Sequence, residues 1–325
     1  MTIPALELTF SFLCGFAAMP GGPFGRQFGD NGWFQLVPVN RGRGPCPDII
    51  KRHDVTFHLY HAHDSRRYHT LAVRDEALLK RSGFDPRLPT VLYIHGFLSG
   101  PDAKDVITNV VSVGEYVGQF LDYLSRHAGP LHGELHLIGH GLGAHVAGVA
   151  ANSTTRARVS RITGLDPSLQ RIGNFPINRR LDPGDAQFID VIHTDGGIFG
   201  VTGRFGHADF YVNRGKAPQP GCNVNEVAHT SPAILGKVFC SHWRAYELYA
   251  ATVLNDFAYP AMRCLSLREF EQGQCRDPSE VVPMGYAVPN SARGTYYLMH
   301  KKRPAIIARN GHSRRRFIRR NNKGS

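Results

Sequence analysis

A glycine occupies the position at which one short motif would place a catalytic serine. Residues 135–145, LHLIGHGLGAH, pass from a short apolar run through a glycine-rich turn into small residues typical of a helix. This order matches the G-x-S-x-G turn, in which a sharp strand-to-helix bend raises a serine hydroxyl above an α/β sheet. Gly139 and Gly143 are the outer glycines, and Gly141 stands where the serine would be. The turn is therefore predicted, but the hydroxyl that would serve as nucleophile is missing.

Two further residues have the types and the order that such a site requires. In α/β hydrolases the acid follows the nucleophile and the histidine follows the acid. Asp166 ends the apolar run 161–165, and α/β sheets carry functional side chains at the carboxyl ends of their strands. His242 lies in a loop before a predicted helix and would act as general base. Backbone N–H groups of Leu142 and of the turn at Phe97 would form an oxyanion hole.

The elements that must position these residues alternate between strands and helices. The apolar runs 90–94, 161–165 and 188–193 are typical of buried parallel strands. Residues 110–127 carry apolar side chains at helical spacing, and residues 243–254 also read as a helix. This alternation predicts an α/β domain with a largely parallel sheet.

A hairpin is expected before this alternation begins. Residues 54–63 and 68–75 alternate between apolar and polar side chains, which predicts two half-buried strands. The polar residues 64–67 would form the turn between them. His58, His61 and His63 in the first strand suggest a metal site, but His58 would point to the other face, so exposed strand histidines are the alternative.

The glycines of the turn permit a second interpretation. Gly139-x-Gly141-x-x-Ala144 after a strand fits the fingerprint of dinucleotide-binding proteins, and Asp166 follows about 20 residues later, where a ribose would need an acid. Against this interpretation, the turn carries bulky histidines and Pro167 follows the acid directly. It also leaves His242 without a role.

Size and composition fit a globular chain. The 325 residues suffice for one large α/β domain or two smaller ones, and 42 % of them are hydrophobic. No stretch reaches the roughly 18 apolar residues of a membrane-spanning helix. Residues 1–18 resemble a signal peptide, although no Lys or Arg precedes the apolar part. We therefore expect a secreted, extracellular protein; a buried apolar N-terminus is the alternative.

Cysteine usage agrees with secretion. Cys222 with Cys240 and Cys264 with Cys275 would close short loops as disulfides, which are stable in an oxidising compartment. Cys46 is then left without a partner of this kind.

Much of the formal charge of +12 lies at the end of the chain. Residues 301–325 contain many lysines and arginines and no acid, as a disordered tail that binds polyanions such as glycosaminoglycans would. A solvated tail without a specific partner is the alternative. No motif for specific nucleic-acid recognition is present in the rest of the chain.

Six blocks of sequence together resemble one family. VLYIHGF, HLIGHGLGAHVAG, RITGLDPS, RLDPGDAQFIDVIHTDGG, GHADFYVNRG and FCSHWRAYELY are similar to segments of the pancreatic-type neutral lipases. The resemblance implies one α/β-hydrolase domain over residues 46–300.

The resemblance also assigns roles by position. Asp166 and His242 match the triad acid and histidine, and Phe97 and Leu142 match the oxyanion-hole residues. The resemblance implies no required cofactor. Asp182 and Asp185 match a structural calcium site of the family, and an Asp-rich turn without metal is the alternative.

Three departures from the family pattern affect function. Gly141 replaces the serine, so no acyl-enzyme can form at this position. The insect yolk proteins resemble the chain in this, since they combine a lipase-like fold with glycine there and a storage or binding role. The loop closed by Cys222 and Cys240, which corresponds to the lid, is short, as is the loop 195–207. In the shortness of these two loops, the chain resembles the phospholipid-cleaving members of the family.

The third departure is a gap of about 30 residues near Asn109 and Val110, between the HGF turn and the helix that precedes the elbow. In the family, a helix, a buried strand and a long loop lie there. Without that strand, residues 54–75 would pair directly with residues 90–94, or the sheet would split. A skipped exon or a faulty gene model would explain the gap.

These observations predict a secreted lipase-family protein that is catalytically impaired and binds or stores lipid-like ligands. Its expected partner is a lipid or phospholipid surface. The alternative is a carboxylic ester hydrolase that acts on phospholipid or triglyceride.

Overall fold

Most of the chain is described by the structure, a computed structural model. It covers residues 5–10, 16–17, 37–38, 51, 55–61, 64–95, 103–131, 134–169, 176–222 and 239–301. For residues 5–10, 16–17, 37–38, 61, 64–67 and 103–108 it describes the backbone alone.

A single sheet of 11 strands organises the described residues, in the order β12-β11-β13-β10-β9-β8-β7-β6-β1-β4-β5. The seven neighbouring strands from β13 to β1 run parallel, and the pairs at both ends are antiparallel. The strands are β1 (Ala5–Phe10), β4 (Val55–His61), β5 (Asp64–Leu71), β6 (Thr90–Ile94), β7 (Leu135–His140), β8 (Arg161–Leu165), β9 (Phe188–His193), β10 (Ala208–Val212), β11 (Pro260–Arg263), β12 (Val281–Pro283) and β13 (Gly294–Leu298). Two short strands, β2 (Phe16–Ala17) and β3 (Val37–Pro38), pair separately.

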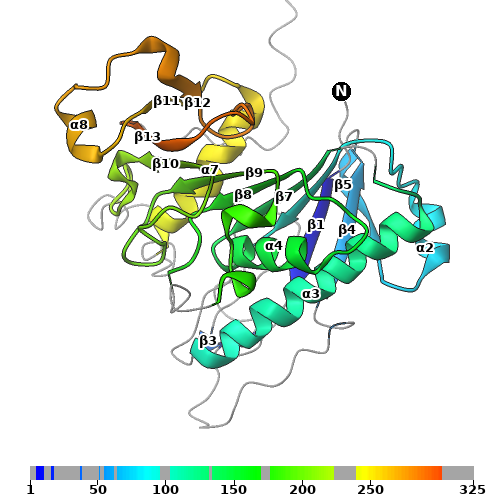
Figure 1. Cartoon of the computed structure of the whole chain (residues 1–325). Helices are drawn as coiled ribbons and strands as arrows, with labels where there is room; N and C mark the ends of the chain where they lie inside the picture. The colour runs from blue at the N-terminus through cyan, green and yellow to red at the C-terminus, as the bar shows by residue number, and fades with distance from the viewer. Residues whose placement is uncertain are drawn as a thin grey trace, which may run out of the picture.

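Helices cover both faces of this sheet (Figure 1). α3 (Ala103–His127) and α4 (Leu142–Ser153) lie on one face, and their side chains share a buried cluster with β4, β6 and β7. α7 (Cys240–Leu254) covers the other face and packs in a second cluster with β9, β10 and β13. The short α2 (Glu76–Ser82) follows β5 at the sheet's edge. The mostly parallel sheet between two helical layers confirms the predicted α/β-hydrolase class.

The N-terminal strand β1 fills the place of the strand that the gap removes. β1 pairs in parallel with β6 and antiparallel with β4, so that Leu6 lies opposite both Leu92 and Leu59. The expectation that the hairpin would pair directly with β6, or that the sheet would split, is therefore wrong. The same residues were expected to belong to a signal peptide, and a chain cleaved after residue 18 would lose this strand.

The gap itself falls inside a continuous helix. Asn109 and Val110 are both buried in α3, which begins at Ala103, seven residues before the predicted start. The helix that precedes the elbow strand therefore continues without a break through the position of the gap.

Other predicted boundaries are confirmed or shifted. β6, β8 and β9 have the predicted bounds. Residues 64–67, predicted as a turn, belong to β5, which already begins at Asp64, and a register shift follows Tyr60. α7 begins at Cys240 rather than at Trp243, so His242 lies in the first turn of the helix and not in a loop before it.

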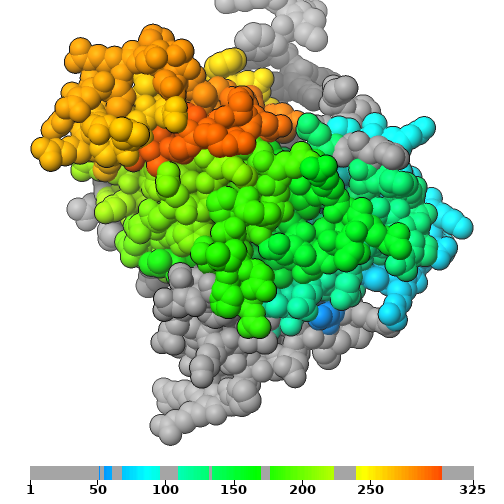
Figure 2. All heavy atoms as spheres, viewed as in Figure 1, coloured from blue at the N-terminus to red at the C-terminus, as the bar shows by residue number. Residues whose placement is uncertain are grey.

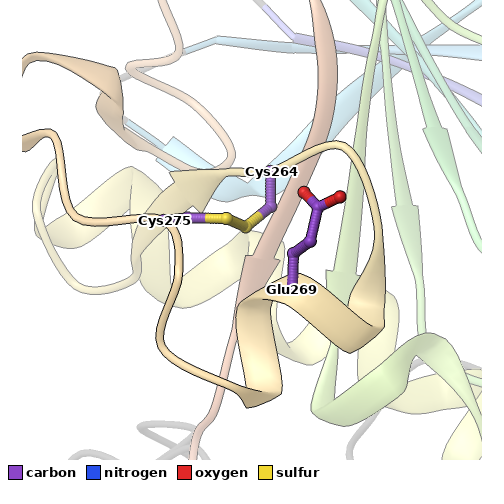
Figure 3. A group of neighbouring side chains, drawn as sticks. All are labelled: Cys264, Glu269 and Cys275. Carbon is purple, nitrogen blue, oxygen red and sulfur yellow. A yellow bond between two sulfur atoms is a disulfide. The ribbon is translucent and has the colours of Figure 1, made fainter.

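Residues after α7 form a smaller lobe at one end of the molecule, drawn in orange in Figure 2. It contains β11, β12 and the one-turn helix α8 (Leu267–Glu271). The predicted disulfide Cys264–Cys275 holds α8 against β11, and Glu269 lies beside it (Figure 3). These three residues are close enough to suggest a metal site, but bonded sulfurs are not thiolate ligands. Cys222–Cys240 forms as predicted, whereas Cys46 lies outside the described residues.

Among the helices of the described residues, none combines the length and the apolar character needed to cross a bilayer.

Candidate active site

The elbow has the backbone geometry that its sequence predicts. Gly141 connects β7 to α4 with φ 57° and ψ −119°, a conformation that L side chains rarely adopt. The outer positions require glycine because neighbouring backbone atoms lie too close for a side chain. A Cβ on Gly139 would lie 2.3 Å from Gly143 O, and one on Gly143 would lie 2.2 Å from Ile94 O. The strand, the helix and β6 can meet this closely only with glycine at both positions.

Asp166 and His242 meet beside this turn, as the sequence predicts. His242 Nδ1 lies 2.6 Å from Asp166 Oδ2, and both residues are buried. Asp166 Oδ1 accepts the N–H groups of Thr194 (2.8 Å) and Asp195 (2.9 Å). The carboxylate accepts a hydrogen bond from His242 Nδ1–H, so the lone pair of the neutral imidazole is on Nε2.

His242 Nε2 points at the position that a serine side chain would occupy. A Cβ built on Gly141 would lie 2.9 Å from His242 Nε2 and 3.3 Å from Ser168 Oγ. The acid, the base and the turn therefore have the arrangement of a serine hydrolase, and the nucleophile alone is absent from the elbow.

One of the two expected oxyanion donors lies within the described residues. Leu142 is the first residue of α4, where backbone N–H groups have no partner inside the helix. The positive end of the helix dipole adds to the attraction for a developing negative charge. The other expected donor, Phe97, lies outside the described residues, as does the lid segment 223–238.

Two more buried histidines hold the site in place as neutral side chains. His145 Nδ1 accepts the N–H of Leu181 (3.2 Å), so its Nε2–H donates to Ser168 O (3.0 Å). Burial lowers the pKa of His145 to about 4. His140 Nε2 donates to the carbonyl of His242 (3.1 Å), and burial together with the neighbouring His242 lowers the pKa of His140 far below 6.5. Both rings act as fixed spacers at neutral pH.

An apolar wall borders His242 on its outer side. The rings of Phe199 and Phe239 are 4.3 Å apart, with Phe199 6.0 Å from the His242 ring and Phe239 6.2 Å from that of Trp243. All three aromatic residues are half-buried. Leu169, which donates its N–H to Phe199 O, is 36 % exposed and continues the apolar surface outward. Such a wall suits an acyl chain.

Asp195 is a second buried carboxylate beside the pair. Its side chain lies within 4.8 Å of the ligand atoms of Asp166 and His242, and Asp195 Oδ1 has no hydrogen-bond partner among the described residues. Burial, and next the charge of Asp166, raise the pKa of Asp195 from 3.8 to about 7.

We expect this carboxyl to make stability fall as the pH rises from 4 to 7, the window set by its two pKa values. In this window the folded state retains a proton that the unfolded chain has lost, so unfolding releases protons and is favoured by higher pH. Asp195→Asn should remove the effect, which is at most a few kcal/mol at about 1.4 kcal/mol per pKa unit. The melting temperature (Tm) of both proteins between pH 4 and 8 tests this. Plots of Tm against pH that run parallel for wild type and Asp195→Asn would contradict this prediction. Glu134→Gln, which changes an exposed carboxylate, is the control.

Asp182 and Asp185, the expected calcium ligands, bond mainly to their own turn. Asp182 Oδ1 accepts the N–H of Gly184 (3.0 Å), and Asp185 Oδ2 accepts that of Asp182 (2.8 Å). Asn152 Nδ2 donates to Asp185 Oδ1. Burial raises the pKa of Asp185 to about 7, so a proton can balance its charge. Calcium takes six to eight oxygens, and this arrangement does not fit such a cage.

Calcium binding nevertheless stays a prediction of the sequence, and thermal unfolding tests it. From the geometry we expect the same Tm in millimolar calcium and in a chelator, because the oxygens are already bonded. A Tm that rises with calcium in the wild type and not in Asp182→Ala would instead establish the site.

The alternative interpretations of the sequence do not fit the structure. Asp166 bonds to His242 and to backbone N–H groups, which leaves it unavailable to a ribose. His58 stacks on Tyr68 with ring centroids 4.2 Å apart, and it belongs to no metal-like group of the described residues. The side chains of His61 and His63 lie outside those residues.

Sequence reasoning missed how three residues take part in the site. Ser168 lies two residues after Asp166 in the sequence, but its approach to position 141 depends on the fold. Asp195 has a signal in the sequence, because it lies two residues after the predicted strand 188–193, much as Asp166 directly follows the strand 161–165. Phe199 lies in a short loop without a recognisable pattern.

Comparisons with known proteins agree with this geometry. A family model described as Lipase matches residues 101–303. Inactive pancreatic lipase-related protein 1 of Mus musculus is 32 % identical over 284 residues, which cover 74 % of this chain and 59 % of the relative. Pancreatic lipase-related protein 2 of Myocastor coypus is 32 % identical over 294 residues, with 74 % and 62 % covered. The human pancreatic lipase-related protein 2 is 38 % identical over 194 residues, with 55 % and 41 % covered.

The extent of these matches decides what they establish. The chain spans about three fifths of the length of the first two relatives, 59 % and 62 %, so their whole activity does not transfer with the match. The matched family model covers more than half of the chain, and it contains the elbow, Asp166 and His242. The chain therefore belongs to the pancreatic lipase family.

Proposed function

We propose that this protein is a secreted member of its family with an impaired hydrolase centre, which binds or stores lipid-like carboxylic esters. The observation that carries the proposal is Gly141, an elbow with lipase geometry and no hydroxyl. In a comparable hydrolase, loss of the nucleophile lowers kcat by about 10⁶. Asp166 and His242 then have no serine to activate at the elbow.

The apolar wall supports an acyl ligand. Phe199, Phe239 and Trp243 form an aromatic surface beside His242, and Leu169 and Ile198 are exposed next to it, the latter by 59 %. Exposed apolar residues around a polar centre favour contact with a lipid or phospholipid surface. The N-terminus of α4 suits the ester oxygen.

Secretion and the other partners rest on sequence and chemistry. Two disulfides fit an oxidising compartment. The basic segment 301–325 supports binding of a polyanion such as a glycosaminoglycan, and nothing in the chain supports specific recognition of nucleic acid. Binding of the ester ligand requires no cofactor in this proposal.

The alternative is a carboxylic ester hydrolase that acts on phospholipid or triglyceride. It is favoured by the intact contact between Asp166 and His242, which a purely binding protein does not need. One relative is named inactive and another is not, so the names of the relatives agree with either function.

Vesicle binding and ester hydrolysis by the purified chain test the proposal together. We expect sedimentation with phosphatidylcholine vesicles and triglyceride emulsion, and fatty-acid release far below that of an intact lipase. Trp243→Ala should weaken vesicle binding, whereas Phe257→Ala, which removes an aromatic ring that is 72 % exposed outside the apolar wall, is the matched control. Rapid fatty-acid release by the unmodified chain would overturn impairment, and absence of binding would overturn the ligand class.

A further inference from the structure

We infer that Ser168 supplies the hydroxyl that the elbow lacks, and that with His242 it forms a displaced nucleophile for slow acyl transfer. The observation behind this is that His242 Nε2 and Ser168 Oγ lie 2.9 Å and 3.3 Å from the same point, the Cβ position of residue 141. The two atoms are therefore separated by no more than the sum of those distances. The inference rests on the proposed function only in taking the cleft as a site for esters.

Ser168 is held on a backbone that cannot easily move. Its N–H donates to Gly141 O (3.2 Å), and its carbonyl accepts from His145 (3.0 Å). On either side of it, Val201 N–H bonds to Pro167 O (2.8 Å) and Leu169 N–H bonds to Phe199 O (2.7 Å). Freedom at this residue is thus confined to rotation of the hydroxyl-bearing side chain.

The hydroxyl itself is not used by the fold. Ser168 as a residue is buried, and its Oγ forms no hydrogen bond with any residue that the structure describes. By contrast, Ser241, the other serine near the triad residues, accepts the N–H of Gln219 on its Oγ (3.0 Å). A hydroxyl that the described residues leave without a hydrogen bond, close to the Nε2 of a histidine, is the arrangement of a nucleophile and its base.

The chemistry follows that of a serine hydrolase with the attacking oxygen displaced. Rotation of the Ser168 side chain brings Oγ within reach of Nε2, which takes the hydroxyl proton as Oγ bonds to the ester carbonyl carbon. The carbonyl oxygen gains the electron pair beside Leu142 N–H, then the ester C–O bond breaks and the alcohol leaves with the proton from His242. Water attacks the acyl-Ser168 ester in the same way, which releases the carboxylic acid and restores the hydroxyl.

From this displaced geometry we expect acyl transfer by the pair to be slow. Ser168 Oγ is not hydrogen-bonded to His242 in the resting structure, so each turnover begins with an unfavourable rotation. The hydroxyl also comes from the loop after β8 and not from the elbow, where the oxyanion donors are aimed.

A fluorophosphonate probe tests the assignment because it traps only an activated hydroxyl. Attack by Oγ forms an O–P bond and expels fluoride, while His242 takes the proton. Tryptic peptides separate the two candidate positions: Ser168 lies between Arg161 and Arg171, whereas residue 141 lies between Arg126 and Arg156. We expect slow labelling of the first peptide in the wild type.

Variants then separate the roles. Ser168→Ala should abolish the label, and His242→Ala should slow labelling by about 10²-fold or more, the lower range for loss of a general base. Ser241→Ala is the matched control and should be labelled like the wild type. Residual hydrolysis of p-nitrophenyl butyrate should fall in parallel with labelling.

An unlabelled wild type, in a preparation whose Gly141→Ser variant is labelled at position 141, would overturn the assignment of Ser168. The same holds if Ser168→Ala retains the label or the residual hydrolysis. Vesicle binding without any label would leave the proposed function standing and remove Ser168 as nucleophile, so the two failures are distinguishable.

Discussion

Gly141→Ser is expected to raise ester hydrolysis by roughly 10³- to 10⁵-fold over the unmodified chain. The upper part of this range approaches the loss of about 10⁶ that removal of the nucleophile causes in a comparable hydrolase. Every other described part of the machinery is in place: the strained turn, the bond between Asp166 and His242, and the N-terminus of α4.

The gain is expected to be incomplete because the His242 ring lies close to the space that the added side chain would need. A serine Cβ would lie 2.9 Å from Nε2, closer than real contacts of this kind, so the ring must withdraw. Its bond to Asp166 (2.6 Å) resists that movement. A side chain at φ 57° also adds backbone strain of about 1–3 kcal/mol, so we expect a lower Tm for the variant.

Steady-state kinetics on p-nitrophenyl butyrate, with Tm measured in parallel, provide the test. Gly141→Ala is the matched control, because it adds the same Cβ and the same strain without the hydroxyl. Equal rates for the serine and alanine variants would contradict the prediction. Loss of the gain in Gly141→Ser combined with His242→Ala would confirm that the histidine acts as the base.

Patterns local in the sequence predicted much of this site. β8 and β9 are short apolar runs with clear ends, so Asp166 could be placed at a strand terminus. The two outer glycines identified the elbow because only glycine permits such close packing between β6, β7 and α4. Chain order then selected His242 as the base, although helix α7 begins three residues earlier than its apolar pattern indicated.

Contacts between distant segments could not be predicted in this way. The approach of Ser168 to position 141 depends on the bond between its N–H and Gly141 O, which joins two loops through the fold. Likewise, β1 carries a pattern that fits a signal peptide and a buried strand equally well. Only the pairing of Leu6 with Leu59 and Leu92 distinguishes the second role.

Disruption of β1 is the second change for which we expect a large effect. Glu7 lies between His58 of β4 and Tyr93 of β6, inside the sheet. Glu7→Pro removes the backbone N–H at this position, and the proline ring obstructs the neighbouring strand. Proline within a strand is tolerated at sheet edges but not at such an interior position. We expect a loss of about 3 kcal/mol or more in the free energy of unfolding, by analogy with proline inside other regular elements.

Urea unfolding measures this loss, and Glu7→Gln is the control because it keeps the backbone donor and the size of the side chain. A chain that starts at Met19 should behave worse than Glu7→Pro, since it would leave β4 and β6 with unpaired edges that favour aggregation. Equal stability of Glu7→Pro and Glu7→Gln would show that β1 does not hold the sheet together.

The same strand determines whether residues 1–18 can be a signal peptide in the folded protein. Cleavage after residue 18 removes every pair that β1 makes, and it opens the sheet between the hairpin and β6, next to the elbow strand β7. A protein that folds through β1 must therefore retain Ala5–Phe10. We expect N-terminal sequencing of the folded protein to find this segment. A mature chain that begins at Met19, remains monomeric and unfolds as cooperatively as the full chain would contradict the expectation. The sheet would then have to close without β1, by the direct pairing of β4 with β6 that the gapped sequence first suggested.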